Sequence, residues 1–439
     1  MFVGRLAAAY RRGIVYRRSL GWRRFALRLL RVWQWAPRLL HAPWLPSSGD
    51  LGRGAVLDGS LPFGVNLCGY VSSETGLGEA ARQAARALEA AGLPFVLNDI
   101  RMTEVANNEL PPVLPTAANP YAFNWFCVNI ADADFVAWER GEAYFRGRYN
   151  IAYWAWEMPE FPREWLSSFA YYDEIWVPSN FVLRSLAAVA PLPVVRVPYV
   201  VPPPPEEGAA GRVLVSRADL GLGEETFVFL FMFHFFSLFE RKNPLGLIEA
   251  FKRAFPGRED VALVIKTAGA SNARGLAEMH RAAAGAKVVI FDKVIDRAAL
   301  NDLYGICDCY ASLHRAEGFG LTLAEAMRAG KPAIATAYGG NCDFMDDANS
   351  YLVPARLTRL PADLGPYKKG WTWAEPDLDA AAEAMRRVYE DRDDAAARAA
   401  RGRADIARLL SPESIGRSIR ERLEAIARAK GLDVPSAGV

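Results

Sequence analysis

The sequence predicts an α/β protein with two doubly wound halves, each a parallel sheet covered by helices. Three observations carry this prediction. Short apolar runs alternate with longer amphipathic runs from about residue 62 onward, which is typical of parallel strands joined by crossover helices. Four consecutive prolines at 202–205 interrupt the alternation, which then starts again. The 439 residues are enough for two to three domains with cores of their own.

The first half begins with a predicted strand at 62–69 and a helix at 76–92. The helix has its alanines and Leu88 on one face and ends at Gly92, a typical C-terminal cap. The further buried strands expected in this half are 95–99, 123–130, 150–156 and 174–178.

The proline run marks the boundary between the halves. Prolines cannot join a sheet ladder, and a run of them favours an extended spacer. The predicted organisation is an arm and linker (1–61), a first domain (62–200), a proline-rich linker (201–211), a second domain (212–410) and a C-terminal helix and tail (411–439).

The second half repeats the pattern of strands and helices. The expected strands are 227–233, 261–266, 287–292, 308–313 and 332–337, and helices are expected at 243–255, at 296–305 and within 376–430. Two such halves leave a cleft between them, and ligands of doubly wound sheets bind beyond the carboxyl ends of the strands.

The charge is unevenly distributed along the chain. Residues 1–49 contain ten Arg and no Asp, Glu or Lys, so the rest holds 42 basic against 50 acidic residues, a balance of about −8. Eight aromatic residues are interleaved with these arginines in 1–46. An amphipathic helix at 22–35 would suit an anionic membrane surface. The main alternative is a helix that packs on the protein's own body. Arginines interleaved with aromatic residues also occur in proteins that bind single-stranded nucleic acid, but we expect no nucleic-acid partner.

The cysteines and apolar runs exclude several classes of protein. Five cysteines without a CxxC pair make a disulfide framework or a zinc site improbable and favour a reducing cytosol. We find no apolar run of membrane-spanning length and no signal-peptide pattern. The expected location is therefore cytoplasmic, at the inner face of the cell membrane if the arm binds lipid.

The stretch HRAEGFGLTLAEAMRAGKP at 314–332 follows a predicted strand and so lies at its carboxyl end. Gly318 and Gly320 let backbone amides approach a ligand closely. The helix expected to begin near Leu321 points its positive end at the same place. This combination suits a diphosphate.

Two glutamates flank this glycine-rich turn, Glu317 before it and Glu325 about one turn into the helix. Carboxylates accept hydrogen bonds from paired hydroxyls, so Glu325 suits a ribose and Glu317 suits a sugar. Two such carboxylates around a phosphate cradle predict a nucleotide-sugar site. A helix-capping loop with two solvated glutamates is the alternative that the spacing alone leaves open.

The longer stretch HRAEGFGLTLAEAMRAGKPAIATAYGGN resembles the E-x7-E signature of retaining glycosyltransferases with the GT-B fold, the large family four, group 1 type. The resemblance covers about 62–430 in element order and is close over 225–377. It implies that Glu317 contacts the donor sugar and Glu325 the ribose, with no metal or other cofactor. The further donor-binding residues that it implies are Gly318, Phe319, Gly320 and Leu321.

Basic residues are needed near the diphosphate because negative charge builds on the leaving phosphate. In ERKNPLGLIEAF (240–251), Lys242 matches the lysine of the family, with a solvated helix start as the alternative. The Gly-Arg pair that usually precedes this lysine is missing, and Arg241 is the candidate replacement. Lys266, at the end of a predicted strand, is a second candidate.

The first half contributes a phosphate or acceptor loop. SSETGLGEAAR (72–82) resembles the family's glycine-rich first loop, in which Gly76 and Gly78 would let the backbone meet phosphate or acceptor. A plain strand-to-helix turn is the alternative.

Many family members place a histidine of the first domain near the sugar, but residues 62–200 contain none. YWAWEMPEFP (153–162) occupies the comparable strand end, which makes Trp156 and Glu157 candidates for that role, and absence of the role is the alternative. His314, beside the E-x7-E motif, is either a donor contact or an orienting hydrogen-bond partner.

The resemblance implies a retaining, metal-independent hexosyltransferase of bacterial cell-surface polysaccharide biosynthesis. It would move a sugar from a GDP- or UDP-sugar to a glycan or lipid-linked acceptor, and, as the resemblance also implies, the leaving diphosphate would take the acceptor proton. The alternative is an inactive GT-B module that binds or scaffolds at a membrane. The glutamate pair and Lys242 favour the enzyme, whereas the missing Gly-Arg pair and the missing histidine favour the module.

Overall fold

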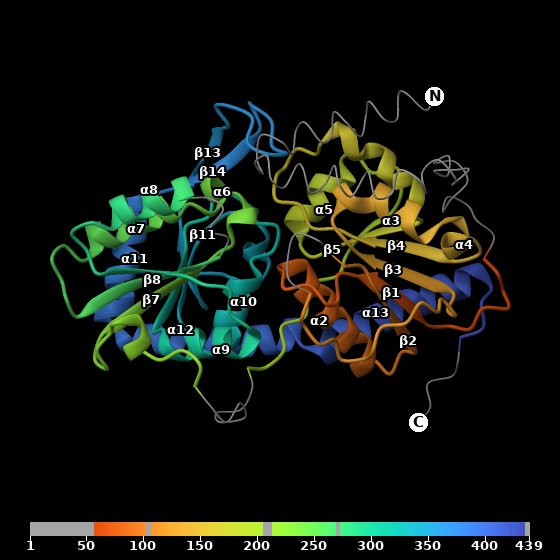
Figure 1. Ribbon diagram of the computed structural model, residues 1–439, viewed down its shortest axis with the longest axis horizontal. Helices are drawn as coiled ribbons and strands as arrows, with labels where there is room; N and C mark the ends of the chain where they lie inside the picture. The colour runs from red at the N-terminus through yellow and green to blue at the C-terminus, as the bar shows by residue number, and fades with distance from the viewer. Residues whose placement is uncertain (1–56, 102–106, 205–212, 269–272, 435–439) are drawn as a thin grey trace.

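The structure is a computed structural model that describes residues 57–101, 107–204, 213–268 and 273–434. Two six-stranded parallel sheets, each covered by helices on both faces, lie side by side (Figure 1). The predicted fold class is thereby confirmed. The arm at 1–46 and most of the predicted proline-rich linker lie outside the described residues.

The first sheet has the strand order β2-β1-β3-β4-β5-β6. Its strands are β1 (Val65–Gly69), β2 (Phe95–Asp99), β3 (Phe123–Cys127), β4 (Tyr149–Tyr153), β5 (Glu174–Val177) and β6 (Val194–Arg196). Its helices are α2 (Gly76–Ala90), η1 (Ile130–Asp132), α3 (Ala133–Arg140), α4 (Glu142–Phe145), η2 (Arg163–Tyr171) and α5 (Asn180–Ala187). The five predicted strands are present, and the short edge strand β6 was not predicted.

The second sheet has the order β12-β11-β10-β7-β8-β9. Its strands are β7 (Phe227–Met232), β8 (Val261–Thr267), β9 (Val288–Asp292), β10 (Cys309–Ser312), β11 (Ala333–Thr336) and β12 (Tyr351–Val353). The helices are η3 (Ala218–Leu220), η4 (Phe235–Ser237), α6 (Phe239–Lys242), α7 (Pro244–Ala254), α8 (Ala273–Ala283), α9 (Arg297–Ile306), α10 (Leu321–Arg328), η5 (Gly340–Asp343), α11 (Leu378–Glu390), α12 (Arg392–Leu410) and α13 (Pro412–Lys430).

Each sheet has one switch point, where the strand order reverses. It lies between β1 and β3 in the first sheet and between β7 and β10 in the second. Crevices at the carboxyl ends of the strands open at such points, and they are the usual ligand sites of open α/β sheets.

Local sequence explains the elements next to these switch points. All six residues of β7 are buried, as expected for a strand covered on both faces. The hydroxyl of Thr75 caps α2 by accepting a hydrogen bond from the Gly78 amide at 3.0 Å. Asn243 caps α7 in the same way, and Pro244 occupies its first turn.

A hairpin that the sequence did not predict projects from the second domain. Its strands β13 (Ala355–Arg359) and β14 (Thr372–Pro376) pair antiparallel, and the hairpin stands beside the first domain (Figure 1). Most of its strand residues are not buried, so no apolar run marked it in the sequence.

The last helix of the second half returns to the first domain. Helix α13 lies along α2 (Figure 1), and the guanidinium of Arg422 pairs with the fully buried carboxylate of Glu174 on β5. The hydroxyl of Tyr149 and the indole of Trp176 donate to the same carboxylate. The chain therefore closes the first domain with residues from its far end.

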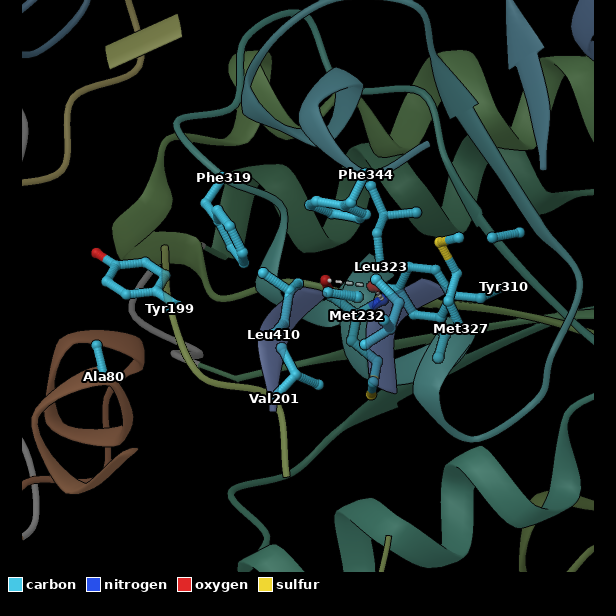
Figure 2. Packing of buried hydrophobic residues seen from close by; sticks show 14 of the residues in the cluster. Ala80, Tyr199, Val201, Met232, Tyr310, Phe319, Leu323, Met327, Phe344 and Leu410 are labelled. Atoms are coloured by element: carbon cyan, nitrogen blue, oxygen red, sulfur yellow. Dashed lines mark hydrogen bonds between the residues drawn. The ribbon is translucent and has the colours of Figure 1, made fainter. Parts of the chain in front are cut away.

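The hydrophobic core is continuous between the two domains. Figure 2 shows Tyr199 beside Phe319, near Ala80 of α2, and the rings of Tyr199 and Phe319 are 5.1 Å apart. Phe319 packs in turn on Phe344, with 5.3 Å between ring centroids. Because the loop that carries the E-x7-E motif contributes to this core, its backbone is held firmly.

Candidate functional site

The predicted site residues of the second domain gather at its switch point. Strand β7 is followed by α6, which carries Arg241 and Lys242, and β10 is followed by the loop that carries Glu317. Helix α10 begins directly after this loop and carries Glu325. The topology therefore brings together two segments that are about 75 residues apart in sequence.

Glu317 is held by two cations. Its Oε2 lies 2.5 Å from Nζ of Lys242 and 3.4 Å from Nη1 of Arg241. Burial alone would raise the pKa of Glu317, but Lys242 and Arg241 outweigh it and bring that pKa to about 2. The carboxylate is therefore ionised at any physiological pH.

Arg241 also contacts a carboxylate of the first domain. Its Nη2 lies 3.6 Å from Oε1 of Glu157, and its other donors bond the carbonyls of Ser237 and Ala316. The Arg241 side chain is only 4% exposed. Its guanidinium thus joins carboxylates from both domains and holds the backbone next to Glu317.

The glycine turn of the motif lies against the first domain. A Cβ on Gly318 would lie 2.7 Å from the carbonyl oxygen of Trp156, so only glycine fits this approach. The hydroxyl of Ser179 donates to the Gly318 carbonyl at 2.6 Å. Gly320 directly precedes α10 and has φ +92°, a conformation that favours glycine. The turn is therefore shaped by the junction of the two domains.

Phe319 and Leu321, both predicted to contact the donor, have side chains that pack in or against the hydrophobic core. Phe319 is 3% exposed and packs in the core, so its side chain supports the turn. Leu321 is the first residue of α10 and packs against the same core. Both side chains therefore contribute to packing.

Glu325 forms a second polar cluster with residues that the sequence did not indicate. Its carboxylate bonds Nη1 of Arg297 at 2.5 Å and the hydroxyl of Tyr304 at 2.8 Å. Arg297 and Tyr304 both belong to α9, which follows β9. A lone arginine at a helix start carries no recognisable pattern, although its place after a strand's carboxyl end was a usable signal.

Arg297 also links this cluster electrostatically to the first domain. Burial would raise the pKa of Glu79 on α2, and the charges of Arg297 and Arg82 lower it. The start of α2 therefore faces the Glu325 cluster across the domain junction.

His314 is fully buried beside the motif. Its Nε2 lies 2.9 Å from the Tyr338 carbonyl oxygen, which only accepts, and its Nδ1 lies 3.1 Å from the Ser312 hydroxyl. Burial lowers the pKa of His314, so the ring is neutral. Of the two roles open for His314, these contacts favour the orienting one.

Lys266 stands at the carboxyl end of β8, near its last residue. Burial lowers its pKa, and Asp292 on the neighbouring β9 acts in the opposite direction. No hydrogen bond or ion pair joins Lys266 to Glu317 or Glu325 in the described part of the chain.

The glycine-rich loop of the first domain packs against itself. Gly76 is exposed with open space where a Cβ would be, whereas a Cβ on Gly78 would lie 2.2 Å from the Ser73 carbonyl oxygen. Arg82 donates to the carbonyls of Val71 and Ser73 and so fixes the same loop. Gly78 therefore serves the local turn, while Gly76 is accessible.

Among the residues that the structure describes, no helix has the length and apolar character needed to cross a membrane. Over the same residues, no three His, Cys, Asp or Glu side chains gather in a way that could hold a metal ion.

Comparison with solved structures defines the class of this fold. Sucrose-phosphate synthase from Thermosynechococcus elongatus superposes with a TM-score of 0.60 at 18% identity, covering 84% of this chain and all of that one. Anabaena Alr3699/HepE in complex with UDP and glucose gives 0.56 at 15% identity, covering 83% of this chain and all of that one. At these identities the likeness shows the fold, which is the two-domain GT-B architecture.

Sequence comparison finds a relative of the second domain. Residues 215–405 match the model of the family Glycosyl transferases group 1, so this segment is similar to that family. A D-inositol 3-phosphate glycosyltransferase from Xylanimonas cellulosilytica is 31% identical over 156 residues, which are 35% of this chain and 36% of that protein. The chain therefore matches about a third of this curated relative. These findings support the resemblance to group 1 glycosyltransferases.

Proposed function

We propose that the chain is a retaining glycosyltransferase that transfers a sugar from a nucleotide-sugar donor to a glycan or lipid-linked acceptor without a metal ion. The observation that carries this proposal is the Lys242–Glu317–Arg241 cluster at the switch point, with Glu325 on the adjoining helix α10. It combines charge for a diphosphate with carboxylates for sugar and ribose hydroxyls at the usual ligand edge of the sheet.

Lys242 would act on the leaving group. When the bond between the sugar C1 and the diphosphate oxygen breaks, negative charge collects on that oxygen, and a fixed ammonium stabilises it. The ammonium of Lys242 pairs with Glu317. Donor binding would let the phosphate share Lys242, and Glu317 would accept hydrogen bonds from the sugar.

The acceptor proton would go to the leaving group. A carboxylate with a pKa of about 2 is a weak base, so Glu317 is poorly suited to remove that proton. Glu157, the other carboxylate of the cluster, is engaged by Arg241 and Tyr367. We therefore propose that the departing phosphate oxygen takes the proton as the acceptor oxygen bonds to C1 on the face that the phosphate leaves, which retains the configuration.

A UDP-sugar is the first donor to test. Structures with the same fold were solved with UDP and glucose, in HepE, and with UDP and α-GlcNAc-glycerol, in a mutant of TarM from S. aureus, with a TM-score of 0.51. The TarM mutant matches 70% of this chain at 12% identity, over 56% of its own length.

The test is a donor screen with purified protein. UDP-, GDP- and ADP-sugars are compared by thermal shift and by release of nucleoside diphosphate, with Glu317→Gln as the inactive control. We expect release from at least one donor, unchanged by EDTA. Release by neither protein with any donor would contradict the proposal, and strong inhibition by EDTA would contradict its metal-independent form. The inactive-module alternative gains no support, because Lys242, Glu317 and Glu325 all lie at the site.

The arm at 1–46 supports a proposal about location. Ten arginines interleaved with aromatic residues favour anionic bilayers, each basic residue contributing about 1 kcal/mol near the surface. We propose a peripheral enzyme at the inner face of the cell membrane, where capture raises the local concentration of a lipid-linked acceptor. Deletion of 1–46 should abolish co-sedimentation with anionic liposomes and spare donor hydrolysis. Full-length protein that ignores such liposomes would contradict this proposal.

A further inference from the structure

The hairpin at 355–376 touches both halves of the site. Its strand β14 leads back into the second domain, and its connecting residues 360–371 meet the first domain (Figure 1). The pattern of the sequence predicts neither the contact of the hairpin with the first domain nor its contact with the second.

On the side of the first domain, the hairpin meets the segment that follows β4. The hydroxyl of Tyr367 donates to Oε2 of Glu157 at 3.0 Å, and its ring packs on Trp156 with 5.4 Å between centroids. The Thr372 amide donates to Glu160 at 3.0 Å. Tyr367 is 4% exposed, so this hydrogen bond is shielded from water.

On the side of the second domain, the hairpin bonds the start of the motif loop. The Ala374 amide donates to the Arg315 carbonyl at 2.8 Å, and Glu375 binds the Arg315 guanidinium through both oxygens at 2.6 and 2.8 Å. The Arg315 amide donates to the carbonyl of Arg241 at 2.8 Å. The hairpin is thus bonded to Arg315, two residues before Glu317, and the Arg315 backbone is bonded in turn to that of Arg241.

We propose that Tyr367 is a positioning residue of the donor site, acting through Glu157 and Arg241 on Glu317. This inference rests on the proposed function. One oxygen of Glu157 is fixed by Tyr367 and the other faces Arg241, whose guanidinium contacts Glu317. The row of contacts runs from the hairpin through the first domain to the carboxylate that would contact the sugar.

The hydroxyl of Tyr367 is the group that holds Glu157 in position. The ring alone would maintain the aromatic packing on Trp156, so a role in packing requires no oxygen. Burial and Glu157 raise the pKa of Tyr367, so the hydroxyl remains a donor throughout the physiological range. Without it, Glu157 would keep one partner and could turn away from Arg241.

Tyr367→Phe tests this role. A hydrogen bond to a charged group contributes enough for about a tenfold change, so we expect kcat for nucleotide-sugar turnover to fall about tenfold with little change in the donor KM. Tyr351→Phe is the matched control, because its hydroxyl also donates to a carboxylate, Asp394, at 2.9 Å within the second domain. The control should keep wild-type kcat. Equal losses in both variants would mean a general loss of stability and would overturn the proposal.

A double-mutant cycle tests the route through Glu157. If Tyr367 acts through Glu157, then Glu157→Gln combined with Tyr367→Phe should be no slower than Glu157→Gln alone, because residues that share one path are not additive. Additive losses would overturn the proposed route.

Hydrogen exchange separates this inference from the proposed function. Amides at 316–320 should exchange faster in Tyr367→Phe than in wild type or Tyr351→Phe, whether or not any donor is turned over. If wild type releases nucleotide from no donor, the proposed function fails, and faster exchange still supports the positioning role. Unchanged exchange at 316–320 would overturn the role even in an active enzyme.

Discussion

The two switch points of this molecule share a topology and differ in chemistry. Each lies where the strand order reverses, and each has a glycine whose missing Cβ allows close backbone contact. At the first, Gly78 approaches Ser73 of its own loop, and Arg82 bonds that loop's carbonyls. At the second, Gly318 approaches Trp156 of the other domain.

The charged residues at the two switch points also differ in whether their partners are local or distant in the chain. The cation at the first switch point is used within its own turn, whereas Lys242 and Arg241 meet a carboxylate that arrives from a different strand. A strand reversal creates a place for a ligand. We infer that convergence of charge from separate segments marks the second switch point as the place for chemistry. The predictions below test this distinction, from the largest expected effect to the smallest.

Glu317→Gln should have the largest effect. It removes the charge that would contact the sugar and leaves Lys242 and Arg241 without their shared carboxylate, so kcat should fall about a thousandfold. The measurement is nucleotide release at saturating donor. Glu249→Gln, whose carboxylate pairs with Arg253 on an exposed helix face, is the control. Near-normal turnover by Glu317→Gln would remove the second switch point from the chemistry.

Lys242→Ala should lower kcat about a hundredfold, the scale for one preorganised charge in a transition state. Lys252→Ala is the control, because Lys252 bonds only backbone carbonyls in the described contacts. Single-turnover rates would show whether the loss lies in the chemical step. If Lys266→Ala is severe while Lys242→Ala is mild, the diphosphate is neutralised at β8.

Glu325→Ala should raise the donor KM about tenfold with kcat nearly unchanged. A ribose contact is equally strong in the ground state and the transition state, so its loss weakens binding uniformly. Steady-state kinetics with a UDP-sugar measures both constants. A change in kcat alone would contradict a ribose role for Glu325.

The two glycines give the most direct comparison. Gly78→Ala should lower stability by about 1–3 kcal/mol through local overpacking and leave the kinetics of the folded fraction unchanged. Gly318→Ala should lower kcat about tenfold, because displacement of the Glu317 turn misplaces the reacting groups. Urea unfolding and donor turnover on both variants measure these effects. A kinetic loss in Gly78→Ala larger than in Gly318→Ala would reverse the distinction.

The last prediction concerns stability and its dependence on pH. The folded pKa of Glu317, about 2, lies below its ordinary value of 4.5, so its ionised form contributes stability above that value. This contribution is lost as pH falls from 4.5 toward 2. The difference in unfolding free energy between wild type and Glu317→Gln should therefore be constant from about pH 8 to 6 and shrink below about 4.5. A difference that shrinks between about pH 8 and 6 would contradict this pKa.

The sequence predicted what regular patterns encode. Apolar runs predicted the strands of both sheets. The spacing of Glu317 and Glu325 around a glycine turn predicted the ligand site at the carboxyl ends of the strands of the second sheet. Arg297, Tyr304 and Tyr367 belong to no sequence motif, because single polar residues become partners only when the fold brings distant segments together. The hairpin was missed because its strands are polar and largely unburied. Phe319 was read as a ligand contact, although its side chain lies in the core that joins the domains.

The pairing of Glu174 with Arg422 has a consequence for synthesis of the protein on the ribosome. Their positions differ by 248 residues, so the carboxylate on β5 emerges long before its guanidinium partner. Until then the first domain contains an acidic group that would be buried without that cation, which opposes its final packing. Completion of the first domain should therefore wait for the last helix. A nascent chain stopped before residue 412 should expose β5 to proteases that the finished protein resists.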